Sequence, residues 1–460
     1  MICWWLKIIL FINDGKIIVI EQMSTIIGFN SGIHDASVSL IQDGIVQAVY
    51  TEERFTHTKM KGGTINLALA FLLKDYRIDP SLVDHFATTT SMILNERILP
   101  DEHNIIKKFR HKIQYYPQHY CHGLGSLIFS NFHTRDDVMV LSLDGGDFNI
   151  HNLTYGEVID DKVYDWLLEN QRTPWHESYK NCCQSVDGML SVYKNGELRV
   201  VKQFNSNFFR LYFLGVTMMI YFYKINGLNV ENNLIATSLK GKVNEHAYRT
   251  FRNLCIFNKQ TESFENHLPA ECKTKNFEHA RIHDSILEPL SKYPIEDVCC
   301  SIQKCLEDLV MEFIDFYQQK YQCKYLCLSG GFFSNIKIIQ KINERSDFDE
   351  VFLMPATDDD GTSVGAALAK CIDLGEYKFE PITNAYYGKG YTEKELIKFI
   401  KIRCINYVPY DHEIVVNELK KGKIVGVFRD RAELGPKSLG NRSILADPSS
   451  KDVLIDLRNK

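Results

Sequence analysis

Short apolar runs separated by glycine-bearing turns characterise the first part of the chain. The apolar pair Ile26-Ile27 leads into a small-residue turn at 28–32, and a strand-like run follows over residues 36–41. Asp43-Gly44 then supplies the turn residues of a tight hairpin. A strand, a small-residue turn and a hairpin in this order predict a sheet that brings backbone amides close to a phosphate.

The same pattern recurs later in the chain. Residues 138–143 form an apolar run typical of a buried strand, and this run ends in Asp144-Gly145-Gly146. Residues 189–204 form a hairpin that turns at Asn195-Gly196. The two stretches predict a duplicated structural unit.

A clear helix is predicted in the second half of the chain. Apolar residues recur with a helical period at Ile302, Leu306, Leu309, Phe313, Ile314 and Tyr317. A strand over 325–328 then meets Ser329-Gly330-Gly331, and a second strand over 351–354 ends at the acidic turn 358–361. A helix of small residues around Gly365 follows, so the order of elements predicts α/β crossovers.

These repeated units predict an α/β fold. They resemble the duplicated actin, hexokinase and heat-shock ATPase architecture, whose two halves close over a nucleotide. We expect this actin/hexokinase-like ATPase fold over residues 23–378. The pattern resets at 375–386 and a new helix is predicted over 393–402, so a partial α/β domain is expected at 379–460.

The first 22 residues stand apart from this pattern. They are apolar but interrupted by polar residues, and no run approaches the roughly 20 residues of a membrane span. We interpret residues 1–22 either as a hairpin turning at Asp14-Gly15 or as an extension upstream of a start at Met23. No membrane partner is expected.

Composition narrows the class of protein. A chain of 460 residues with 45% hydrophobic residues predicts a globular protein of two or more domains. The formal net charge of −5 and the lack of a basic patch argue against nucleic acid as a partner. The 13 cysteines form no zinc-ribbon pairs, so we expect reduced thiols, mostly small buried side chains, in a cytoplasmic protein.

Two histidines and two aspartates form a candidate metal site. His119 and His122 share one face if their segment is helical. Asp144 and Asp359 each follow a predicted buried strand, where ligands gather in α/β sheets. Mixed nitrogen and oxygen ligands suit Fe(II), Mn or Zn. From the residues alone, a surface helix with two unrelated histidines is the commoner outcome.

Three further groups of residues are candidates for ligand binding. Ser329-Gly330-Gly331 predicts either a phosphate or ribose contact or a plain helix start. His34-Asp35 and Glu52-Glu53-Arg54 predict either an active-site rim or solvated hairpin ends. The basic residues around the loop 435–440 favour phosphate or carbamoyl phosphate over a charged face.

Together these segments resemble the O-carbamoyltransferases that modify antibiotics and nodulation factors. The resemblance runs from about Ile26 to the last residue. It rests on the order and spacing of His34-Asp35-Ala36-Ser37, Glu52-Glu53-Arg54-Phe55, His119 to His122, Asp144-Gly145, Leu328-Ser329-Gly330-Gly331 with Asn335, Asp359-Asp360-Gly361 with Gly365-Ala366-Ala367, and the run from Arg431 to Ser443.

The resemblance implies a reaction in two parts. Carbamoyl phosphate and ATP would form carbamoyladenylate in the C-terminal domain, with release of pyrophosphate and inorganic phosphate. The N-terminal domain would then transfer the carbamoyl group to a hydroxyl of a small-molecule or sugar acceptor. Neither the acceptor nor the oligomeric state can be read from the sequence.

The resemblance also assigns residues to these parts. It implies that His122, Asp144 and Asp359 hold a divalent metal, expected to be Fe(II), and that His34 with Asp35 lies near the transferring group. The nucleotide would contact Gly330, Gly331 and Asn335. The adenylate-forming pocket would include Arg431, Arg442 and Ser443.

The chain departs from the family pattern at three places. One is Asn232-Asn233-Leu234-Ile235-Ala236-Thr237, which stands where the family has a Gly-Lys-Met-Gly-Leu-Ala run. Gln118 stands where the family has a histidine four residues before the one that matches His122, and His119 is the candidate to substitute for it. The sequence ends at Lys460, before two segments of the family's second domain. We therefore expect a truncated second domain that folds poorly and an impaired activity.

Two alternatives remain open from the sequence. A sugar kinase or ATPase of the same fold would need an acidic base and complete phosphate loops but no histidine pair. A catalytically dead binding protein would retain only the nucleotide cleft. Adenylate formation distinguishes them from a carbamoyltransferase.

Overall fold

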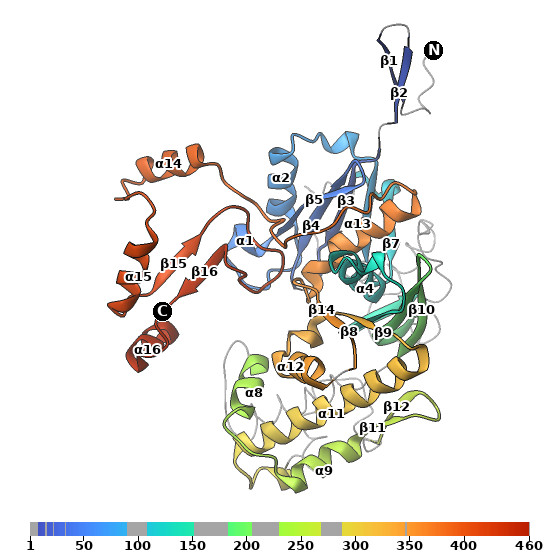
Figure 1. Ribbon diagram of the computed structural model, residues 1–460, viewed down its shortest axis with the longest axis vertical. Coiled ribbons are helices and arrows are strands. Elements are labelled where there is room, and N and C mark those ends of the chain that lie inside the picture. Colours follow the sequence, from blue (N-terminus) through green and yellow to red (C-terminus); the bar gives the residue numbers. More distant parts are fainter. Residues whose placement is uncertain are drawn as a thin grey trace.

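Two five-stranded mixed sheets form the centre of the protein in the computed structural model (Figure 1). The structure describes residues 8–13, 16–21, 23–32, 34–89, 108–150, 183–204, 230–267, 288–345 and 347–459.

The first sheet is built from the N-terminal hairpin unit. Its spatial order is β5 (Ile45–Thr51), β4 (Ser37–Gln42), β3 (Ile26–Asn30), β6 (His85–Thr89) and β7 (Ile113–Tyr116). Strands β3, β4 and β5 pair antiparallel, whereas β6 pairs parallel with β3 and with β7. The predicted turn at Asp43-Gly44 joins β4 to β5, and both residues have positive φ.

The second sheet repeats this topology. Its order is β10 (Glu197–Phe204), β9 (Cys183–Lys194), β8 (Val138–Ile150), β13 (Tyr325–Ser329) and β14 (Glu350–Leu353). Strands β8, β9 and β10 are antiparallel, and β13 is parallel to β8 and β14. Because the order and the directions match in both sheets, the structure confirms the duplicated unit and the actin-like ATPase fold predicted from the sequence.

Two helices connect the halves. Helix α13 (Thr362–Asp373) packs on β3, β4 and β6, and helix α4 (Gln118–Phe129) packs on β8 and β13. The helices also contact each other, and a Cβ atom at Gly365 would overlap the carbonyl oxygen of Cys121. The small residues predicted at the start of α13 therefore let the two helices approach closely, and this contact brings residues of both halves together.

Further helices cover the outer faces of the sheets. Helix α2 (Asn66–Asp75) packs on β4 and β5, close to the short helix α1 (Glu53–Thr56). Helix α11 (Ile295–Tyr321) carries the predicted apolar stripe, and all six residues of that stripe are buried in the core under the second sheet. The elements that pack beside α11 are α8 (Val230–Ser238), α9 (Glu245–Leu254), β11 (Cys255–Asn258) and α12 (Ile336–Arg345), and β12 (Ser263–Asn266) pairs with β11.

The C-terminal segment stands beside the first sheet (Figure 1). It contains α14 (Glu393–Ile402), α15 (His412–Lys420), β15 (Val425–Phe428), β16 (Arg442–Leu445) and α16 (Lys451–Asn459). Strands β15 and β16 pair only with each other, and α14 and α15 contain no buried residue. The boundary expected at 378/379 stays a prediction.

At the other end of the chain, β1 (Ile8–Asn13) pairs antiparallel with β2 (Lys16–Glu21). The turn predicted at Asp14-Gly15 lies outside the described residues. A search of the described helices finds none that is long and apolar enough to cross a bilayer.

Candidate functional site

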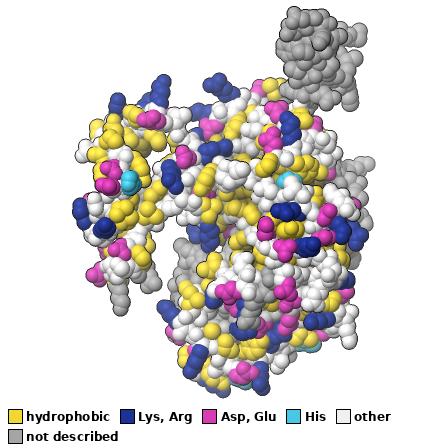
Figure 2. Space-filling model, viewed as in Figure 1, with side chains coloured by type: hydrophobic (Ala, Val, Ile, Leu, Met, Phe, Trp, Pro, Cys, Tyr) yellow, Lys and Arg dark blue, Asp and Glu magenta, His cyan; other side chains and the backbone are white. Residues whose placement is uncertain are grey.

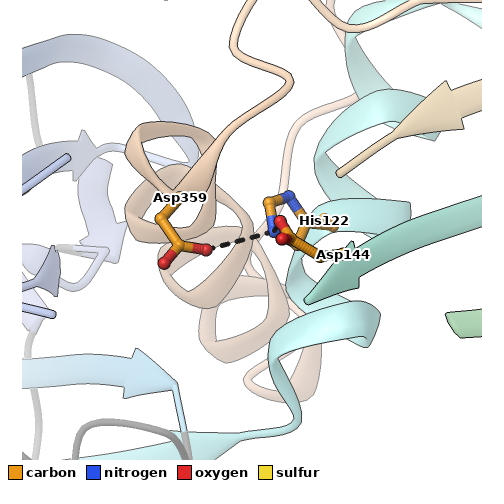
Figure 3. Close-up of side chains that lie close together, drawn as sticks. All are labelled: His122, Asp144 and Asp359. Carbon is orange, nitrogen blue, oxygen red and sulfur yellow. Dashed lines mark ion pairs between the residues drawn. The ribbon is translucent and has the colours of Figure 1, made fainter. Parts of the chain in front are cut away.

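Three side chains from distant parts of the sequence meet between the two halves (Figure 3). His122 comes from α4, Asp144 from β8, and Asp359 from the turn η10 (Asp359–Gly361) that precedes α13. The Nε2 atom of His122 lies 3.1 Å from Asp144 Oδ2 and 3.4 Å from Asp359 Oδ1. The three candidate ligand atoms all lie within 4.8 Å of one another.

The local fold explains this convergence. Pro117 precedes α4 and has no backbone N–H to leave unpaired at the helix start, so the helix begins at Gln118 and places His122 in its second turn. Asp144 follows the buried run of β8, beside the Gly330-Gly331 turn that ends β13. The close contact between α13 and α4 then brings Asp359 to the same place.

The spacing of the three side chains fits a divalent cation. Ligand atoms that share an ion at about 2.1 Å lie about 3.0 Å apart in octahedral and about 3.4 Å apart in tetrahedral geometry. The His122 side chain is fully buried, and both of its ring nitrogens lack an aligned hydrogen-bond partner among the described residues. Because a buried polar atom without a partner is destabilising, the imidazole is suited to coordinate an ion.

The electrostatics of the cluster also favour a bound cation. Burial lowers the pKa of His122, but Asp144 and Asp359 outweigh burial and raise that pKa to about 10. Burial and the neighbouring carboxylates Asp144, Asp35 and Asp359 raise the pKa of Asp358 to about 7. Carboxylates crowd around one point here, which favours a cation.

Gln118 and His119 take different places around this cluster. The side-chain amide of Gln118 donates to Asp359 Oδ1 at 2.5 Å. His119 faces away, with Nδ1 at 2.9 Å from Ser142 Oγ and Nε2 at 3.1 Å from the Val186 carbonyl oxygen. Burial and His122 lower the pKa of His119 to about 4. The structure therefore does not bring His119, which the sequence offered as a ligand, into the cluster.

The Gly330-Gly331 turn supports Asp144. Gly330 has φ +94°, and a Cβ atom there would overlap the carbonyl of Leu143. The Gly331 N–H donates to Asp144 Oδ2 at 3.0 Å. Asn335 follows this turn in sequence and forms other hydrogen bonds. Its side-chain amide donates to Gln303 Oε1 at 2.9 Å, and its Oδ1 accepts from the Lys337 N–H at the start of α12.

His34 and Asp35 lie at the edge of the cluster. The two side chains contact each other at 2.8 Å, and His34 Nδ1 is 4.0 Å from Asp359 Oδ2. The contact with Asp35, against the effect of burial, raises the pKa of His34 to about 10. The His34 side chain is 44% exposed, so a ligand at the cluster could reach it.

The polar residues of the C-terminal loop each contact different groups. The Arg431 guanidinium donates to the carbonyls of Gln47, Tyr387 and Gly388. These bonds tie Arg431 to β5 and to the segment before α14. Arg442 lies 2.8 Å from Glu433 Oε2, and Ser443 Oγ accepts from the Gly440 N–H at 3.2 Å.

A pocket lies between the first sheet and this C-terminal loop. It is lined by Val49, Tyr50, Thr51, Arg54, Phe55, Gly388, Lys389, Tyr391, Phe428, Ala432, Glu433 and Arg442. Arg54 and Arg442 both donate to the Gly435 carbonyl oxygen there. Arg54, predicted to lie either at an active-site rim or at a solvated hairpin end, is part of this lining. Asp358 was not predicted as a site residue, although the acidic run 358–360 could have indicated it.

Comparisons with known proteins match this site to a family. The family model described as carbamoyltransferase N-terminus matches residues 88–368, and the one described as carbamoyltransferase C-terminus matches residues 416–460. The first match contains the whole cluster of His122, Asp144 and Asp359.

Individual proteins resemble this chain at low sequence identity or over part of their length. An uncharacterised protein of Methanocaldococcus jannaschii is 27% identical over 352 residues, which cover 74% of this chain and 52% of the relative. Nodulation protein NolO of Bradyrhizobium diazoefficiens is 32% identical over 33% of this chain and 29% of its own length. The solved structure of HypF from T. kodakarensis has 13% identity and a TM-score of 0.41, covering 80% of this chain and 52% of that chain.

This chain thus spans about half the length of the first of these relatives. The N-terminal family match alone covers more than half of the chain and includes β8 and β13 of the second sheet. The protein belongs to the carbamoyltransferase family.

Proposed function

We propose that this protein takes part in ATP-dependent transfer of a carbamoyl group from carbamoyl phosphate, through carbamoyladenylate, to a hydroxyl of a small-molecule or sugar acceptor. The observation that carries the proposal is the cluster of His122, Asp144 and Asp359 inside the segment that matches the family. Membership of the family supports transfer of a carbamoyl group, and we assign this transfer to the site formed by the cluster.

We assign His122, Asp144 and Asp359 as the residues that would hold a divalent ion, which the resemblance implies to be Fe(II). A bound ion would polarise a carbonyl or phosphoryl oxygen as a Lewis acid. The fully buried imidazole without an aligned hydrogen bond and the 3.1 Å and 3.4 Å separations support this assignment.

His34 and Asp35 are assigned to the transferring group. Because the contact with Asp35 favours the protonated imidazole, His34 acts as a hydrogen-bond donor rather than as a general base. A donor at this position would stabilise negative charge that develops on the carbamoyl oxygen during attack by the hydroxyl. Its partial exposure beside Asp359 supports this role.

ATP is assigned to two neighbouring places. The turn at Gly330-Gly331 ends β13 beside the cluster, where small residues allow a phosphate or ribose to approach the backbone. Asn335 would complete this site from the start of α12. Arg431, Arg442 and Ser443 would serve the adenylate-forming pocket, together with Arg54, which lines the same pocket as Arg442.

The transfer half of the reaction can be tested without adenylate formation. Freshly prepared carbamoyladenylate is given to the purified chain with a divalent ion, and AMP release is measured against the uncatalysed rate, with water or an added sugar as acceptor. We expect acceleration that His122→Ala reduces by at least about 100-fold. His246→Ala, an exposed histidine on α9, is the control and should retain the rate.

Two results would contradict the proposal. One is a rate of AMP release equal to that without protein. The other is transfer of the ATP γ-phosphate to a sugar in the absence of carbamoyl phosphate, which would identify a sugar kinase of the same fold.

A further inference from the structure

Gln118 contacts the candidate metal cluster of His122, Asp144 and Asp359, although its side chain supplies no imidazole or carboxylate. It is the first residue of α4, one helical turn before His122, and it is 5% exposed. Its amide nitrogen lies 2.5 Å from Asp359 Oδ1, the same oxygen that lies 3.4 Å from His122 Nε2. The amide therefore contacts a candidate ligand atom directly.

Within the described part of the chain, the cluster contains a single imidazole. His119 is adjacent in sequence, but both of its ring nitrogens contact other groups, Ser142 and the Val186 carbonyl. Position 118 is on the same helical face as His122, so a histidine there would place a second ring nitrogen toward Asp359. Gln118 occupies that place with a neutral side chain.

The choice of side chain at position 118 affects which ion is bound. Imidazole ligands favour Zn, Fe and Ni, whereas carboxylate, carbonyl and water ligands suit Mn and Mg. With Gln118, the three candidate ligands are one nitrogen and two carboxylates. This set discriminates less strongly against Mn(II) than a set with two imidazoles would.

The N–H contact also restrains Asp359. A carboxylate that accepts a hydrogen bond from a buried neighbour keeps its orientation before the ion arrives, and loss of such a partner typically weakens metal binding by about 10–100-fold. The backbone carbonyl of Asp359 is held in η10 by the Asn30 amide and the Thr362 hydroxyl, and Gln118 adds a contact to the side chain.

We propose that Gln118 is a positioning and specificity-determining residue of the metal site: it orients Asp359 and, by excluding a second imidazole, shifts the preference of the site toward harder ions such as Mn(II). The inference rests on the metal site of the proposed function. It adds a role for a residue that is not itself one of the three candidate ligands.

The test compares two ions in the purified 460-residue chain. Dissociation constants for Mn(II) and Co(II) are measured by titration, with the visible spectrum of bound Co(II) as a second readout. We expect Gln118→His to raise the affinity for Co(II) relative to Mn(II) by about tenfold or more and to shift the Co(II) bands, because a nitrogen ligand is added. Gln118→Ala should weaken both ions by about 10–100-fold.

Two controls separate this inference from the metal site itself. Gln318→His changes another buried glutamine, in α11, and should leave the ratio of the two affinities unchanged. His122→Ala should abolish tight binding of both ions. An unchanged affinity ratio and spectrum in Gln118→His, with wild-type binding intact, would overturn the role of Gln118 alone, whereas a wild-type protein that binds neither ion would overturn both this inference and the metal site.

Discussion

The carboxylate of Asp144 shows how single residues build the site. His122 and the Gly331 N–H both contact Oδ2 of this side chain, and against the effect of burial they bring its pKa down to about 2. The backbone can offer that N–H only because Gly330 adopts a positive φ against the carbonyl of Leu143. The glycine turn therefore helps to fix a candidate ligand in addition to any contact with a nucleotide.

Gly330→Ala should be clearly destabilising. A Cβ atom at this position would overlap the Leu143 carbonyl, and the positive φ adds strain of about 1–3 kcal/mol. Gly196→Ala is a matched control, because Gly196 has φ +80° but nothing within 4 Å of its added Cβ. Urea unfolding should show a larger loss of unfolding free energy for Gly330→Ala than for Gly196→Ala. Equal losses would mean that the contact with Leu143 is not tight.

At the level of elements, one arginine joins the C-terminal loop to the first sheet. Arg431 donates to the Gln47 carbonyl in β5 and to the carbonyls of Tyr387 and Gly388, in the segment before α14. The Asn441 side-chain amide donates to the backbone carbonyl of Arg431. Lys389 adds a contact with Asp75 of α2 at 2.6 Å. These bonds position the wall of the pocket that carries Glu433 and Arg442.

Arg431→Ala should loosen this connection. The change removes three hydrogen bonds from a charged group, each of which contributes about 1.5–3 kcal/mol. The Gln47 carbonyl keeps the Tyr76 hydroxyl as a donor and the Tyr387 carbonyl keeps the Val49 N–H, so the loss falls in the lower part of the summed range. Hydrogen exchange should become faster in residues 386–390 and 429–433 while α11 stays protected. Arg249→Ala, which removes an exposed i,i+4 ion pair with Glu245, is the control and should change little. Unchanged exchange in the Arg431 variant would show that the loop is held by other contacts.

Local patterns were sufficient to predict much of the fold. The Asp43-Gly44 hairpin, the apolar run that became β8 and the stripe of α11 depend on neighbours in sequence, and the structure confirms them. The placement of His119 could not be derived in this way, since the packing of α4 on β8 decides which helix face meets the cluster. Likewise, no local signal in the sequence shows that Arg431 donates to the Gln47 carbonyl of β5, because the two residues are 384 positions apart.

At the scale of the whole molecule, the two halves bury most of their large apolar side chains, whereas the C-terminal segment leaves many of them exposed. Large apolar side chains are exposed along that segment, among them Phe399, Ile402, Tyr410 and Ile444. Figure 2 shows apolar side chains gathered over the arm that carries α14, α15 and β15. By contrast, α11 buries more than half of its residues.

Limited proteolysis should follow this difference. Segments with few buried contacts open at low free energy, so trypsin should cut at Lys394 and Lys398 of α14 before it cuts at Lys304 and Lys320 of α11. Mass spectrometry of the early fragments identifies the sites. Cleavage in α11 at the same rate as in α14 would contradict the difference in stability.

The central claim is that His122, Asp144 and Asp359 form one metal centre between the two halves. The most direct test is an anomalous diffraction map from crystals of the protein soaked in Mn(II). The account predicts an anomalous peak within about 2.0–2.3 Å of His122 Nε2 and of a carboxylate oxygen from each aspartate. A fully soaked crystal with no peak among these three side chains would contradict it.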